Sequence, residues 1–198
     1  MALKEVLIDE LRDMYSAENQ LVKALPKLAK GAIDSNLKNL FTEHLAETKG
    51  QVERLKQVFQ LLEEKPTGEH CNGMEGVIEE GADALDKDEE GASFDSGILG
   101  AALRTEHYEI AGYKAAIAMS NVLGLSEVTS LLTENLNEEL AAAEKILGLS
   151  QSIFEEAADQ PEEEEEEEKP KTAKEKTSEK KSKQDEKAAA PSLRKKKS

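Results

Sequence analysis

The spacing of apolar residues constrains this chain most, because it follows the helical period over four long stretches. Apolar side chains recur three and four residues apart in residues 3–30, 36–63, 96–123 and 126–156, which is the pattern of amphipathic helices. Aromatic residues make up only 4% of the chain, and runs rich in β-branched residues are few, so no sheet is predicted. The sequence therefore predicts an all-α protein with four long helices.

The second and third of these helices are joined by a connection that is too long for a simple bundle turn. Pro66 and Gly68 are expected to end the second helix, since both residue types interrupt helices. Within the connection, residues 74–85 have helical spacing and predict a short helix, and the run DKDEEGAS that follows is typical of a loop. The predicted architecture is a four-helix bundle with a long crossover between helices 2 and 3.

Individual residues predict which side chains cap the helices and where the first helix is kinked or broken. Pro26 lies inside the first helical pattern, and a proline there removes a backbone donor, so a kink or break is expected. Asp34 or Ser35 is expected to cap the second helix, and Ser96 and Ser126 are expected to cap the third and fourth.

Composition divides the chain into a body, residues 1–158, and a tail, residues 159–198. The tail holds seven consecutive glutamates and a lysine-rich end with almost no apolar residues, so it is predicted to be disordered. Its acidic and basic residues are equal in number, so the body carries the whole net charge of −16. That charge excludes phosphate contacts by the body with nucleic acid and favours attraction of cations. The basic end of the tail could contact anionic partners.

The cysteine content and the lack of targeting segments indicate the cellular compartment of the protein. Cys71 is the only cysteine, which excludes a disulfide framework and a cysteine-based zinc site. No signal peptide and no apolar run long enough to span a membrane is recognised. A cytoplasmic protein is therefore expected.

Acidic side chains occur at positions of the helical pattern where apolar residues belong. Buried carboxylates repel one another and are costly unless a cation lies among them. Four-helix carboxylate proteins hold two iron or manganese ions in this way. The alternative for each glutamate is a position at the edge of the core, where the stem packs and the carboxylate reaches water. The candidates are Glu18, Glu47 with His44 beside it, Glu106 flanked by Glu109, and Glu138 or Glu139.

The motif of the known carboxylate bundles is incomplete in this sequence. Those proteins use Glu-x-x-His on two helices, whereas His44 precedes Glu47 here and Gly50 occupies the position of the expected histidine. The fourth helix has no histidine, and Ala142 stands three residues after Glu139. A histidine-poor metal site and a bundle without metal are both compatible with this pattern.

Residues 42–55 recur as residues 133–146 at a fixed offset of 91. A duplication, or a packing geometry shared by the two helices, would explain the repeat. The alternative is a chance likeness between two glutamate-rich helices. The offset pairs Glu47 with Glu138, His44 with Asn135, and Arg54 with Lys145.

Four blocks, DMYSAENQLVKALPKLA, HLAETKGQVERL, CNGMEG and EHYEIAGY, resemble the YciF-like branch of the ferritin-like proteins. The resemblance covers about residues 3–157 and excludes the tail. It implies a rubrerythrin-like bundle with a long crossover, a stress-associated bacterial protein, a homodimer and a di-iron centre. The glutamates that it implies to point inward are Glu18, Glu47, Glu106 and Glu138, with His44 and Glu109 as additional ligands.

Two hypotheses about function follow. In the first, the chain binds two iron or manganese ions, oxidises ferrous iron and consumes peroxide or oxygen, with Tyr15 or Tyr108 orienting the carboxylates. In the second, it is a non-enzymatic acidic bundle that acts by dimerising and by binding partners.

Overall fold

The computed structural model describes residues 2–67, 69–85 and 91–159, and within these ranges all regular structure is helical. The prediction of an all-α protein is therefore confirmed. The proposed tail, apart from Asp159, lies outside the described residues. The helices are α1 (Leu3–Gly31), α2 (Ser35–Leu61), α3 (Asn72–Leu85), α4 (Gly91–Val122) and α5 (Ser126–Ala158).

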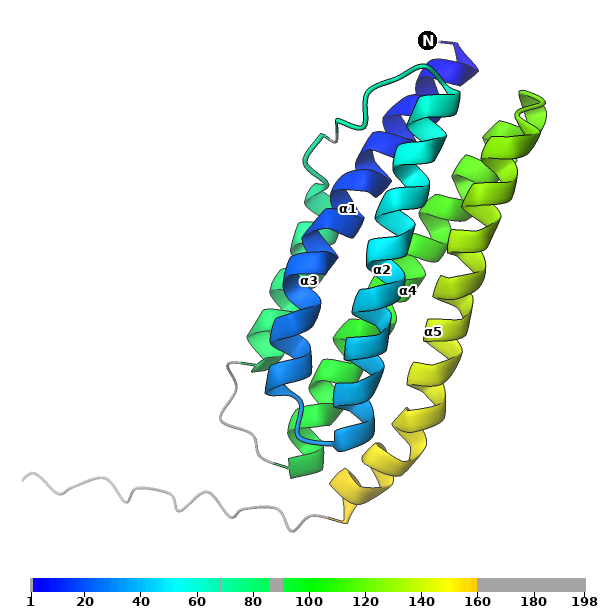
Figure 1. Cartoon of the computed structure of the whole chain (residues 1–198). Helices are drawn as coiled ribbons and strands as arrows, with labels where there is room; N and C mark the ends of the chain where they lie inside the picture. The colour runs from blue at the N-terminus through cyan, green and yellow to red at the C-terminus, as the bar shows by residue number, and fades with distance from the viewer. Residues whose placement is uncertain (1, 68, 86–90, 160–198) are drawn as a thin grey trace, which may run out of the picture. The chain divides into compact units, whose positions relative to one another are not determined.

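The four long helices α1, α2, α4 and α5 form the predicted bundle, and the short α3 lies in the crossover between α2 and α4 (Figure 1). α1 packs against α2, and α4 packs against α5. α3 runs along the outside of the bundle, where it packs against α4 and α1. Among the described residues, no helix is both long enough and apolar enough to cross a membrane.

Of the predicted helix caps, the structure confirms the one at the start of α2 and corrects the two at the starts of α4 and α5. The Asp34 carboxylate accepts hydrogen bonds from the amides of Asn36 and Leu37 at 2.8 and 2.9 Å, so it caps α2 as predicted. Ser96 lies inside α4 and donates to the Ala92 carbonyl. Ser126 is the first residue of α5, which begins after Leu125 without a side-chain cap, and Gly124 at φ 69° closes the turn before it.

Pro26 does not break α1, which continues to Gly31. The proline is exposed, and the preceding Leu25 is buried in the core. Burial of such leucine side chains on both sides of the proline offsets the backbone hydrogen bond that it removes.

The apolar core is divided into two clusters along the length of the bundle. One cluster contains Leu7, Leu11, Leu55, Phe59 and Leu132 with their neighbours. The other contains Leu21, Leu37, Phe41, Leu99 and Ile146 with theirs. Every long helix places buried polar residues between the two clusters, so the bundle encloses a polar layer at its middle; α4 also buries Asp95 and Ser120 nearer its ends.

Candidate metal centre

The polar layer is built by one or more turns from each long helix. Each side chain faces inward because it follows the same three- and four-residue spacing as the leucines above and below it. All of its members are buried. They are Glu18 on α1; His44, Thr48 and Gln51 on α2; Thr105, Glu106 and Glu109 on α4; and Asn135 and Glu139 on α5.

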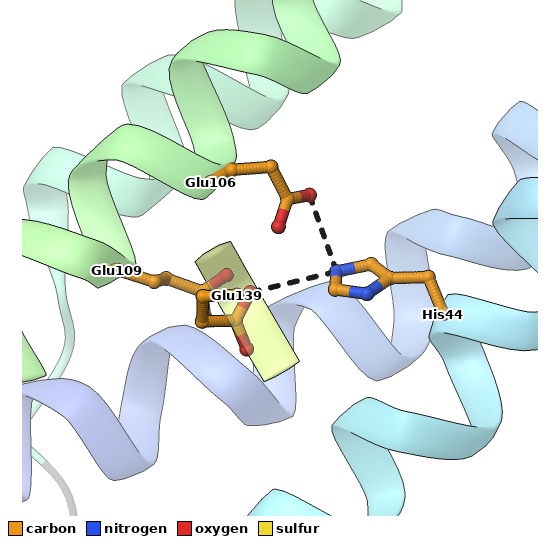
Figure 2. Close-up of side chains that lie close together, drawn as sticks. All are labelled: His44, Glu106, Glu109 and Glu139. Atoms are coloured by element: carbon orange, nitrogen blue, oxygen red, sulfur yellow. Dashed lines mark ion pairs between the residues drawn. The ribbon is translucent and has the colours of Figure 1, made fainter. Parts of the chain in front are cut away.

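Four of these side chains converge closely enough to bind a cation. His44, Glu106, Glu109 and Glu139 each offer a ligand atom, and these atoms lie within 4.8 Å of one another. The Nε2 atom of His44 is 3.2 Å from Oε1 of Glu106 and 3.9 Å from Oε2 of Glu139, as the dashed lines in Figure 2 show. The carboxylates come from α4 and α5, and the imidazole comes from α2.

Most polar atoms of this group have no hydrogen-bond partner. Both oxygens of Glu109, Oε2 of Glu106 and Oε2 of Glu139 are buried and accept no hydrogen bond, and neither does Oε2 of the neighbouring Glu18. Leaving such atoms buried and unsatisfied is costly. Several carboxylate oxygens and one imidazole nitrogen form a donor set suited to iron or manganese. The residues present therefore fit a metal centre.

The protein environment also shifts the pKa values of the ionisable side chains in the polar layer. Burial raises the pKa of Glu18 to about 8, and it raises the pKa values of Glu109 and Glu139 well above the ordinary range. Burial alone lowers the pKa of His44, but the hydrogen bond and charge of Glu106 reverse this and raise it well above its ordinary value. Without a metal the layer therefore retains protons, which a cation would displace.

Hydrogen bonds from neighbouring side chains hold the carboxylates of Glu18 and Glu139 in place. The Tyr113 hydroxyl donates to Glu18, and the Asn135 amide donates to the Tyr113 oxygen at 2.8 Å. The Gln51 amide donates to Glu139. Tyr113 is fully buried, so its hydroxyl reaches the Glu18 carboxylate inside the core. The roles of Gln51 and Asn135 were missed, although Gln51 interrupts the apolar stripe of its helix beside His44.

Two residues that the sequence predicted as inward ligands lie outside the group of four. The Glu47 carboxylate is 3.3 Å from Nζ of Lys145, and its other oxygen is 3.5 Å from Nδ1 of His44. Glu138 pairs with Arg54 instead, and both glutamate side chains remain 32% exposed. Of the two residues that the sequence left open, Glu139 faces the core and Glu138 does not, so the inward position that the resemblance implied for Glu138 is corrected.

The two tyrosines proposed to orient the carboxylates, Tyr15 and Tyr108, make their contacts with other residues. The Tyr108 hydroxyl donates to Asp13 and lies 3.1 Å from the Cys71 sulfur. Burial raises the pKa of the Cys71 thiol, which suits a packed rather than a reactive cysteine. Tyr15 packs edge-on against Phe59, with ring centroids 5.9 Å apart.

Comparison with known proteins identifies relatives of the whole helical body. Residues 2–159 match the family described as a domain of unknown function, DUF892. Protein YciF of Escherichia coli is 38% identical over 149 residues, which cover 75% of this chain and 90% of YciF.

Solved structures agree with this match. The crystal structure of the E. coli stress protein YciF superimposes with a TM-score of 0.76 at 36% identity, covering 78% of this chain and 98% of that one. YcfI from Rhodopseudomonas palustris has a TM-score of 0.72 at 40% identity, covering 74% and 94%. The chain therefore belongs to the DUF892 family of YciF-like proteins and shares their ferritin-like helical fold.

Proposed function

We propose that this chain is a di-metal carboxylate protein that uses iron or manganese to oxidise ferrous iron with dioxygen or peroxide. The observation that carries the proposal is the set of unpaired, buried carboxylate oxygens around His44. Evolution of a purely structural core would favour apolar side chains at these positions, since buried, unpaired polar groups are destabilising.

The residues of the polar layer would have distinct roles. His44 supplies the nitrogen ligand, and Glu106, Glu109 and Glu139 supply oxygen ligands. Glu18 adds a fifth ligand, because it interacts electrostatically with this group and has a free buried oxygen. When bound, the metal supplies one-electron redox chemistry and polarises oxygen ligands.

Positioning of these ligands falls to their neighbours. Gln51 holds one oxygen of Glu139, so that the other stays directed toward His44. Glu47 faces the second ring nitrogen of His44, which is the kind of outer contact that orients a metal-binding imidazole. As the substrate, each ferrous ion gives up one electron, so two ions and two protons reduce one hydrogen peroxide to two waters, and four ions and four protons reduce one dioxygen to two waters.

Metal stoichiometry and turnover test this function. We expect full-length protein loaded anaerobically with ferrous iron to retain about two ions per chain and to form ferric iron when peroxide or air is added. The mass of bound iron and the consumption of oxidant are the measurements. A protein that retains no iron would instead support the second hypothesis, a non-enzymatic bundle acting through dimerisation and partners.

We also propose that the protein acts in the cytoplasm under stress. The E. coli relative is described as a stress protein, and a peroxide-consuming iron site suits such a role.

A homodimer is proposed from a row of exposed apolar side chains on α5. Leu140, Leu147 and Phe154 recur every seven residues and are 38%, 51% and 47% exposed, so they form one stripe along the helix. We expect light scattering at micromolar concentration to give a dimer mass. Leu147→Glu should give a monomer, whereas Ile33→Glu, at an equally exposed residue outside the row, should not. A monomeric wild-type protein would refute the proposal.

A further inference from the structure

A small apolar cavity lies between α1, α3 and α4, and none of the four converging residues His44, Glu106, Glu109 and Glu139 lines it. Its volume is about 60 Å³, and most of its walls are aliphatic side chains. The exposed residues Lys27 and Ala82 lie at its outer edge, whereas Leu21, Ala102 and Thr105 form its buried inner wall. The cavity therefore runs from the surface into the bundle.

The inner wall of the cavity lies next to the polar layer on two helices. Thr105 is one turn before Glu109 on α4, and Leu21 is one turn after Glu18 on α1. α1 and α4 run in opposite directions (Figure 1), so both steps lead toward the same end of the bundle. The cavity and the carboxylates are therefore separated by about one helical turn.

The lining favours an apolar guest over a polar one. Among the lining residues, the hydroxyl of Thr105 already donates to the Ala101 carbonyl at 3.2 Å, and Lys27 lies at the exposed edge. Peroxide would lose its hydrogen bonds to water there, which is costly, whereas dioxygen has none to lose. Engineered apolar cavities of roughly 150 Å³ stay dry and take up xenon or benzene, so this smaller one suits a gas.

We propose that the cavity is the route by which dioxygen, rather than peroxide, reaches the polar layer. This inference rests on the proposed function and assigns the cavity to dioxygen, one of the two oxidants named there. The side chains of Leu21 and Thr105 close the inner end, and their rotamer changes open it for a diatomic molecule.

Xenon tests the cavity in full-length, metal-free protein. Under xenon pressure, the methyl resonances of Leu21, Leu28 and Ile78, which line the cavity, should shift, and those of the distant cluster residue Leu132 should not. Absence of these shifts would overturn the proposal.

Two variants at glycines of α3 sharpen the test. Gly81 lines the cavity, and a β-carbon there would lie 3.4 Å from that of Ala101, so Gly81→Leu should fill the space and abolish the xenon shifts. Gly76 has open space around it, so Gly76→Leu should keep them. Ala24→Leu fills the cavity from α1 if Gly81→Leu does not fold.

The kinetic measurement compares two oxidants on iron-loaded protein. The cavity-filling variant should slow oxidation by dioxygen severalfold and leave oxidation by peroxide at the wild-type rate, and Gly76→Leu should change neither. Equal slowing with both oxidants, or no slowing with either, would overturn the route. If xenon binds as expected but wild-type protein oxidises no iron, the proposed function fails, and the route fails with it.

Discussion

Replacing Glu139 with glutamine is expected to abolish tight binding of Fe²⁺ or Mn²⁺, whereas the same change at Glu138 should leave it close to wild type. Glu139 is fully buried in the group of four, and one of its oxygens is unpaired. Glu138 pairs with Arg54 near the surface. Loss of an outer contact to a metal ligand already costs roughly 10–100-fold in affinity, so loss of the ligand itself should cost more.

Anaerobic isothermal titration of the two variants measures this difference between adjacent residues of one helix. In the Glu139→Gln protein, the amide oxygen can still accept the hydrogen bond from Gln51, so the fold should be kept. The stability of the metal-free protein should stay the same or rise, because a buried carboxyl is removed. Glu138→Gln weakens a half-exposed ion pair, which is worth about 0–1 kcal/mol. Equal loss of metal in both variants, or in neither, would place the site elsewhere.

The metal-free protein is expected to lose stability as the pH rises from about 4.5 to about 8, the interval set by the ordinary and raised pKa values of Glu18. Burial raises the pKa values of Glu109 and Glu139 in the same direction. The folded chain then holds protons that the unfolded chain has released. This contribution is complete below the unfolded pKa and is lost as the pH rises through the folded pKa.

Urea denaturation at several pH values across that interval measures the effect, which for Glu18 alone is on the order of a few kcal/mol. Glu18→Gln should reduce the change of the unfolding free energy with pH. General charge repulsion within the acidic chain would persist in this variant, so the comparison distinguishes the two causes. Saturating Mn²⁺ should restore stability at the alkaline end, by about 2.7 kcal/mol at a hundred times the dissociation constant. Stability that rises with pH, or a slope unchanged by Glu18→Gln, would contradict the prediction.

The long helices could be predicted from the sequence, because burial in a bundle repeats the same spacing of apolar residues over many helical turns. The short helix in the crossover and the Asp34 cap also follow from local patterns. The choice between Glu138 and Glu139 was left open, although the helical period indicates it. Leu132 and Ile146 lie seven residues to either side of Glu139 and are buried with it, whereas Glu138 is turned by about 100° from that face.

The partners of the tyrosine hydroxyls could not be predicted from the sequence. Tyr113 lies one turn after Glu109 and is buried with it, whereas Tyr108 is only partly buried, and their hydroxyls bond Glu18 and Asp13, respectively. Which carboxylate a phenol meets depends on the partner helix, and the period of its own helix carries no information about that partner.

The two ion pairs between α2 and α5 reveal a local pseudo-twofold axis. Glu47 pairs with Lys145, and Arg54 pairs with Glu138. The sequence offset of 91 converts the first pair into the second, as a rotation that exchanges two antiparallel helices requires. The axis passes through the polar layer, where the same operation relates His44 to Asn135. Any two cation positions related by this axis would be chemically unequal, since one has an imidazole where the other has an amide that is bonded to Tyr113 and Arg54.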